Sequence, residues 1–292
     1  MQTLLRDRLT EALGHPVTVT STCNVGGGSI NQAQLLILDD ESRVFVKFNR
    51  DAPGTMFETE ARGLNLLAQS EGGPRVPRVI ACETAASPRF LALEYLESTS
   101  PGIDYPVRFG QALAALHRTT APTFGLDHDN FIGSTPQINT PAKDGLAFFR
   151  DQRLGYQQEL ARRAGLLPAA VDRKLDQLRA NLKNLLDITG EQPALSHGDL
   201  WSGNHLCGPN GEPVIFDPAA HYGLREADLA MTELFGRLPQ AFYEAYHQAF
   251  PLNPGYAERR EIFNLYHLLN HLNLFGGSYL GSVESIVHRF TR

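Results

Sequence analysis

The chain has 292 residues, a formal net charge of −6 and 20% charged residues. This length allows one large domain or two lobes with a sizeable core. The sequence has neither a basic run typical of nucleic-acid binding nor an apolar run of membrane-spanning length, so we expect neither partner. Three isolated cysteines and the lack of a visible signal peptide favour a cytoplasmic protein with reduced thiols.

The first hundred residues alternate short strands with two helices. A short amphipathic helix is predicted over 2–13, ended by Gly14 and Pro16. A second helix is predicted over 57–69, where the apolar residues recur at helical spacing. The expected strands cover 17–23, 31–38, 43–49, 78–82 and 89–95. This pattern predicts a small, mostly antiparallel N-terminal lobe over residues 1–96.

After a polar stretch at 97–102, which resembles a hinge, the pattern becomes mainly helical. Helices are predicted over 107–117, 144–164 and 168–186, and again from 226 onward. Residues 120–142 form a long loop, and such loops are uncommon unless they are functional or disordered. We therefore predict a two-lobe α+β fold in which residues 97–292 form the larger helical lobe.

The most specific pattern in the chain is His197-Gly198-Asp199-Leu200-Trp201-Ser202-Gly203-Asn204, followed by Asp217 at the end of a short apolar strand. This is the order and spacing of a kinase catalytic loop and a metal-binding Asp. Asp199 can accept or orient the proton of an attacking hydroxyl. Asn204 and Asp217 offer hard oxygen ligands, which Mg²⁺ prefers. The sequence therefore predicts a kinase that uses ATP and Mg²⁺.

Two neighbouring residues could support this loop. His197 is expected to pack and hydrogen-bond within the loop, since Asp199 suits the role of base better. Asp228 near the start of a helix has two readings: a simple helix N-terminal acid, or a brace beneath the catalytic loop.

A glycine-rich turn, Gly26-Gly27-Gly28-Ser29-Ile30-Asn31, lies between two predicted strands. Backbone N–H groups in such a turn can bind phosphate oxygens, so nucleotide contacts are predicted at Gly27, Gly28, Ser29, Ile30 and Asn31. The same glycines would also suit a simple flexible hairpin. The turn lacks the P-loop signature, which argues against a Walker-type site.

Lys47 lies in the apolar strand that follows this turn, on the same face as Phe45. It could be an ordinary exposed side chain, but the downstream motif favours a lysine that reaches the nucleotide phosphates and pairs with a helix Glu. Glu60 shares a helix face with Phe57 and Leu64, so it is the better partner than a solvated Glu58. By position alone, Glu94, Tyr95 and Leu96 are assigned to adenine binding through their backbone.

The catalytic string, together with Phe216-Asp217-Pro218-Ala219, resembles the fructosamine (ketosamine) kinase family, within the aminoglycoside-phosphotransferase group of protein-kinase-like folds. The resemblance covers nearly the whole chain, including segments around Met56, Asn130, Phe148 and Tyr266. It implies transfer of the ATP γ-phosphate to the C3 hydroxyl of a ketoamine, free or protein-bound, in deglycation repair. It also implies Asp199 as base, Asn204 and Asp217 as Mg²⁺ ligands, and Lys47 and Glu60 as residues that order the phosphates.

Several positions leave the substrate open. Many members have a Trp where this chain has Gly145, and some have a Cys where Ser29 stands. Trp201 could stack on the sugar or anchor the catalytic loop. His267 and His271 have a spacing that could bind metal, but without a third ligand they more simply line the substrate cleft or an interface.

Two rival functions follow from the same residues. One is a kinase of this fold that acts on an aminoglycoside, choline or a sugar. The other is a non-catalytic nucleotide-binding scaffold, although such a protein would be expected to lack the lysine, base or metal ligand.

Overall fold

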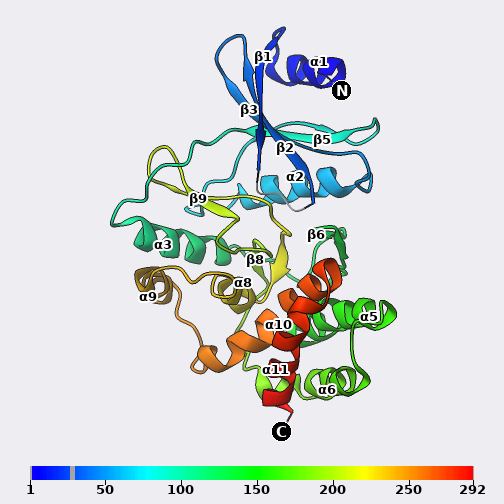
Figure 1. The fold of residues 1–292 in the computed structure, drawn as a ribbon. Helices are drawn as coiled ribbons and strands as arrows, with labels where there is room; N and C mark the ends of the chain where they lie inside the picture. Colours follow the sequence, from blue (N-terminus) through cyan, green and yellow to red (C-terminus); the bar gives the residue numbers. More distant parts are fainter. Residues whose placement is uncertain (1, 27–29, 292) are drawn as a thin grey trace.

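The computed structural model describes residues 2–26 and 30–291, which form a sheet-rich lobe stacked on a larger helical lobe (Figure 1). The sheet is antiparallel throughout, with the strand order β1-β2-β3-β5-β4. Its strands are β1 (Val19–Val25), β2 (Gln32–Leu38), β3 (Arg43–Asn49), β4 (Val79–Glu83) and β5 (Arg89–Glu94). The predicted α+β class is confirmed, and the predicted boundary at residues 96 and 97 falls between β5 and the first helix of the larger lobe.

Two helices cover opposite faces of this sheet because its strands alternate in the direction of their side chains. Helix α1 (Gln2–Leu13) packs Leu5 and Leu9 into a cluster that contains Val44 and Val46. Helix α2 (Met56–Leu67) joins the other cluster, against which Phe45 packs. Lys47 shares the face of Phe45, so its side chain points toward α2.

The larger lobe is built around a long helix, α10, which packs against α8, α5 and α11. A buried cluster of aliphatic and aromatic side chains joins these helices. Within residues 2–26 and 30–291, no helix is both long and apolar enough to cross a membrane. The helices are α3 (Tyr105–His117), α4 (Gly145–Phe148), the π-helix η1 (Phe149–Gly155), α5 (Tyr156–Arg163), α6 (Ala169–Ala180), α7 (Leu182–Leu185), α8 (Arg225–Met231), α9 (Gln240–Ala249), α10 (Tyr256–Phe275), the 3₁₀ turn η2 (Gly277–Tyr279) and α11 (Leu280–Phe290).

Two of the predicted helices differ in detail. The helix expected over 144–164 contains the π-helix η1, and the helix expected over 168–186 is interrupted at Asn181 between α6 and α7. The segment expected as a structureless loop over 120–142 contains a small hairpin, β6 (Asn130–Ile132) and β7 (Thr135–Gln137). Strands of three residues are too short to show an alternating pattern in the sequence.

Four further short strands surround the catalytic loop. They form two antiparallel pairs, one on each side of the loop: β8 (Ala194–Ser196) with β11 (His221–Gly223), and β9 (His205–Cys207) with β10 (Pro213–Ile215).

Backbone contacts connect the two lobes close to this loop. Arg75 N–H donates to Pro213 O over 2.9 Å, and Ile215 N–H donates to Arg75 O over 2.9 Å. Gly63 of α2 lies against the segment after Asp217, where a Cβ on Gly63 would be 3.3 Å from the Ala220 Cβ. This close approach holds α2 over Asp217.

Candidate active site

The side chain of Lys47 connects the two lobes at the cleft. Its Nζ donates to Glu60 Oε1 over 2.7 Å and also to Asp217 Oδ1. Lys47 is 6% exposed, and although its burial opposes the charge, the carboxylates of Asp217 and Glu60 raise its pKa above the ordinary lysine value. The structure therefore joins β3, α2 and the segment after β10 at one ammonium group.

Asp217 has an unusual backbone for a residue with a side chain. Its φ is +59°, in the left-handed region, which non-glycine residues adopt rarely but Asp tolerates better than most. Its side chain is 42% exposed toward the cleft, unlike that of Lys47. A strained backbone of this kind recurs at functional sites, where the surrounding structure holds it.

Asp199 and Asn204 contact each other within the catalytic loop. Asn204 Nδ2 donates to Asp199 O over 2.8 Å and to Asp199 Oδ2 over 3.2 Å. Burial, and then the nearby Asp217 carboxylate, raise the pKa of Asp199 to about 7, and the hydrogen bond from Asn204 opposes this. Because the amide nitrogen of Asn204 is engaged, its amide oxygen is the atom left to bind a cation.

Asp228 supports the loop from below. Its Oδ2 accepts from the backbone N–H of His197 over 2.6 Å, and its Oδ1 accepts from that of Gly198 over 2.7 Å. His117 of α3 contacts the same carboxylate, with Nε2 3.2 Å from Oδ2, and its Nδ1 is 2.7 Å from the Tyr246 hydroxyl. These contacts agree with the hypothesis that Asp228 braces the catalytic loop from beneath. Sequence reasoning missed His117, whose only signal is a polar residue at the end of an apolar helix.

His197 is fully buried inside the loop. The Asp199 N–H donates to His197 Nδ1 over 3.3 Å, so the other nitrogen, Nε2, carries the proton and donates to Phe216 O over 2.9 Å. The imidazole thus connects Asp199 to Phe216, the residue before Asp217, as a structural rather than a proton-transferring group.

Of the three residues assigned to the substrate, His267 lies beside Asp199, and the other two pack against Phe235. His267 of α10 is buried, with Nδ1 3.9 Å from Asp199 Oδ1, and this nitrogen has no hydrogen-bond partner among the described residues. Trp201 is half-buried and packs edge-on against Phe235, with ring centroids 6.2 Å apart. His271 donates from Nδ1 to His267 O over 2.8 Å and lies 4.6 Å from the Phe235 ring.

The glycine-rich turn is described only at its edges. Gly27, Gly28 and Ser29 lie outside the described residues, so their predicted contacts with nucleotide stay predictions. Asn49 at the end of β3 donates to Ile30 O over 3.2 Å and to Asn31 Oδ1 over 3.0 Å. These bonds fix the returning side of the turn relative to the strand that carries Lys47.

The segment assigned to adenine lies at the junction of the lobes. The Glu94 carboxylate bonds to Arg75 Nη2 over 2.6 Å, and the Glu94 N–H donates to Arg78 O over 2.9 Å. Arg43 lies over the Tyr95 ring at 4.8 Å, and Leu96 is buried. Neither the side chain nor the N–H of Glu94 is free for a base, so adenine would have to use other backbone groups of this segment.

The hairpin of residues 120–142 is attached to the chain just after Asp217 by buried amides. Asn130 Nδ2 donates to Ala220 O over 2.8 Å, and Gln137 Nε2 donates to Ala219 O over 3.0 Å. Tyr266 of α10 donates to Gln137 Oε1 over 2.6 Å. The hairpin therefore belongs to the wall of the site, between α10 and the segment after Asp217.

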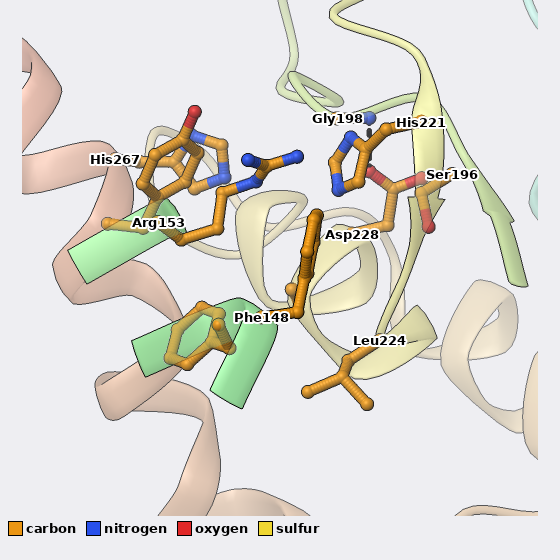
Figure 2. A pocket seen from close by; sticks show the side chains of 11 residues that line it. Phe148, Arg153, Ser196, Gly198, His221, Leu224, Asp228 and His267 are labelled. Carbon is orange, nitrogen blue, oxygen red and sulfur yellow. Dashed lines mark hydrogen bonds between the residues drawn. The ribbon is translucent and has the colours of Figure 1, made fainter. Parts of the chain in front are cut away.

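A cavity of about 20 Å³ lies beside the loop, lined by Ser196, Gly198 and Asp228 among other residues (Figure 2). Arg153 reaches into it between His221 and His267, above the Phe148 ring. Burial lowers the pKa of Arg153 to about 10, and its guanidinium donates to Ile138 O over 2.6 Å. This space holds about one water molecule, so it is not a substrate pocket. No role was predicted for Arg153 from the sequence.

Gly145 packs against the edge of a buried ring rather than an open cleft. A Cβ at this position would lie 2.7 Å from Phe124 Cζ, and Phe124 stacks on Phe148 with centroids 6.1 Å apart. In this chain, Phe124 fills the space that a larger residue at position 145 would need.

The chain is similar to known proteins over its whole length. Residues 1–292 match the family model described as fructosamine kinase. A protein of Synechocystis named probable ketoamine kinase is 44% identical, over 99% of this chain and 96% of its own. The chloroplastic protein-ribulosamine 3-kinase of Arabidopsis thaliana is 40% identical, over 96% of this chain and 85% of its own. The crystal structure of a "putative fructosamine-3-kinase" from Thermobifida fusca is 35% identical, with a TM-score of 0.88 over 98% of each chain.

Proposed function

This chain belongs to the fructosamine kinase family, and from that premise we propose that it transfers the γ-phosphate of ATP to the C3 hydroxyl of a ketoamine. The observation that carries the proposal is the Lys47 ammonium held between Glu60 and Asp217, beside the Asp199–Asn204 pair. This is the arrangement of groups that phosphoryl transfer requires. No observation favours an aminoglycoside, choline or a scaffold role over a ketoamine.

The catalytic step that we propose is direct. The C3 oxygen forms a bond to the γ-phosphorus as the bond between that phosphorus and the ADP oxygen breaks, and the hydroxyl proton passes to the Asp199 carboxylate. Lys47 orients the phosphates, and Glu60 holds Lys47 in place. No covalent enzyme intermediate is needed.

Mg²⁺ fits the residues at this site. The amide oxygen of Asn204 and the partly exposed carboxylate of Asp217 are hard oxygen donors, and Mg²⁺ commonly uses one or two protein carboxylates together with substrate phosphates. When bound, Mg²⁺ neutralises charge on the phosphate oxygens. We assign Asn204 and Asp217 to it, and Ile30, Asn31 and the backbone of 94–96 to the nucleotide. A cytoplasmic location stays a prediction.

The test is ATP consumption with Mg²⁺ across ribulose-lysine, fructose-lysine, a glycated protein, an aminoglycoside and choline, with Asp199→Asn as control. We expect turnover on the ketoamines that the variant loses. Turnover on the aminoglycoside or choline alone would overturn the proposed substrate. ATP binding with no turnover of any acceptor would favour the scaffold reading.

A further inference from the structure

A group of aromatic side chains continues outward from the catalytic loop. Its members, which we call the aromatic strip, are Phe235, His271, Phe275 and Tyr279. The ring centroids are 4.6 Å apart for Phe235 and His271, 5.5 Å for His271 and Phe275, and 5.1 Å for His271 and Tyr279. Phe275 is 48% exposed, and the other three rings are partly exposed. Exposing a patch of aromatic rings to water is unfavourable, and such patches on proteins mark binding sites for a ligand or a partner.

The strip begins next to the base. Trp201, two residues after Asp199, packs edge-on against Phe235. His267, whose Nδ1 is 3.9 Å from Asp199 Oδ1, is one helical turn before His271 on α10, and Phe275 is one turn further. Each step of four residues advances about 6 Å along a helix. When the reacting hydroxyl of a substrate is held at Asp199, the rest of that substrate can therefore reach the aromatic strip.

We propose that the aromatic strip binds the amine half of the ketoamine, as a secondary alkylammonium with its hydrocarbon chain. This inference rests on the proposed function. In a ketoamine the nitrogen lies only three bonds from C3, and at neutral pH it carries a positive charge. Aromatic faces attract such a cation, and they also cover the methylene groups of a lysine side chain.

The charges of the strip suit this ligand. The strip contains no lysine or arginine that would repel a cation, and burial lowers the pKa of His271 below its ordinary value. The Nδ1–H of His271 is used by His267 O, which holds the ring in place. The strip therefore offers ring faces and no fixed charge, which favours an extended alkylammonium over an anionic or strongly polar group.

The first test compares two ribulose ketoamines, one made from methylamine and one from Nα-acetyl-lysine. For Phe275→Ala and Tyr279→Ala, we expect the ratio of kcat/KM for the lysine adduct to that for the methylamine adduct to fall about tenfold. Ile103→Ala, at a fully exposed apolar residue outside the strip, is the matched control and should leave this ratio unchanged. Thermal unfolding of each variant checks that it folds.

The second test uses the unmodified protein and so does not depend on variants. Lengthening the amine from methyl to butyl should raise kcat/KM by up to about fourfold for each buried CH₂. Replacing the ketoamine nitrogen by an ether oxygen should lower kcat/KM. Phe235→Leu keeps a bulky apolar side chain without an aromatic face, so it should reduce the preference for nitrogen over oxygen. Turnover of the methylamine adduct with no effect of chain length, charge or strip variants would overturn the inference alone. A wild-type protein inactive on every ketoamine would overturn the proposed function with it.

Discussion

The carboxylate of Asp228 lies directly beneath Gly198, with Oδ1 2.7 Å from the Gly198 nitrogen. Through this contact and the matching bond to His197 N–H, helix α8 sets the height of the catalytic loop. Gly198 itself has φ +83° and its position would place a Cβ 2.2 Å from Ala219 O. The loop that carries Asp199 is thus held from below by a carboxylate and packed from above against the segment after Asp217.

Asp228→Asn is expected to lower the free energy of unfolding by about 2–4 kcal/mol, because it replaces a buried charged acceptor of two backbone N–H groups. Turnover should also fall, since the loop loses its support. Urea denaturation and steady-state kinetics measure both effects. Asp176→Asn, at an exposed carboxylate, is the control. Equal stability of Asp228→Asn and wild type would contradict the brace.

The buried carboxylate of Asp228 should also make the stability of the fold depend on pH. Burial opposes ionisation of Asp228, but the contact with His117, together with His197 and the Gly198 N–H, outweighs it and lowers the pKa to about 2. A depressed pKa stabilises the fold above the unfolded value of about 3.9, and this contribution is lost as the pH falls toward 2. The stability difference between wild type and Asp228→Asn should therefore shrink between about pH 4 and pH 2 in denaturation experiments.

Gly198→Ala should destabilise the protein far more than a left-handed φ alone would. Gly190→Ala is the matched control, because Gly190 has φ +78° and no atom within 4 Å of an added Cβ. The control should cost about 1–2 kcal/mol from backbone conformation. We expect a larger loss for Gly198→Ala, with little turnover, because its Cβ meets a carbonyl oxygen. Similar unfolding midpoints for the two variants would argue against the close packing.

Glu60→Gln should weaken the hold on Lys47 and raise the KM for ATP at least tenfold, because the ammonium then has only Asp217 as a charged partner. Glu58→Gln, two residues earlier on the exposed side of α2, is the control. Initial rates at varied ATP give the KM values. A Glu60→Gln enzyme with the ATP kinetics of the control would remove the role assigned to the ion pair.

Asp199→Asn should lower turnover by about 10²-fold or more, because asparagine cannot accept the hydroxyl proton. ATP binding should stay nearly intact, because asparagine keeps the shape of the side chain. Rapid-quench turnover and calorimetric ATP titration separate the two effects. Wild-type-like turnover would disprove the base assignment.

Asp217→Ala should weaken the use of Mg²⁺ and ATP together, because it removes one proposed metal ligand and one partner of Lys47. The apparent Mg²⁺ requirement, measured by titrating Mg²⁺ at fixed ATP, should shift to higher concentration. An unchanged Mg²⁺ requirement would contradict the metal role of Asp217.

Local patterns in the sequence predicted much of the fold and the central residues of the site. The strand β3 has the predicted bounds, since alternating apolar residues with a high strand propensity specify it locally. Helical periodicity placed Glu60 on the inward face of α2, where the structure brings it to Lys47. The spacing of Asp199, Asn204 and Asp217 was enough to predict a kinase, because all three residues lie within one short stretch of chain.

Only the tertiary structure decided how this stretch is supported. His117 and Asp228 are separated by 111 positions, and Asn130 meets Ala220 O across 90. Such contacts leave no periodic trace in a sequence, because they depend on how helices and loops pack rather than on neighbouring residues. The same holds for the left-handed backbone of Asp217 and for the contact of Phe235 with His271, which brings a distant segment against α10. The sequence determined the chemical groups and their local elements, and long-range packing determined which of them meet.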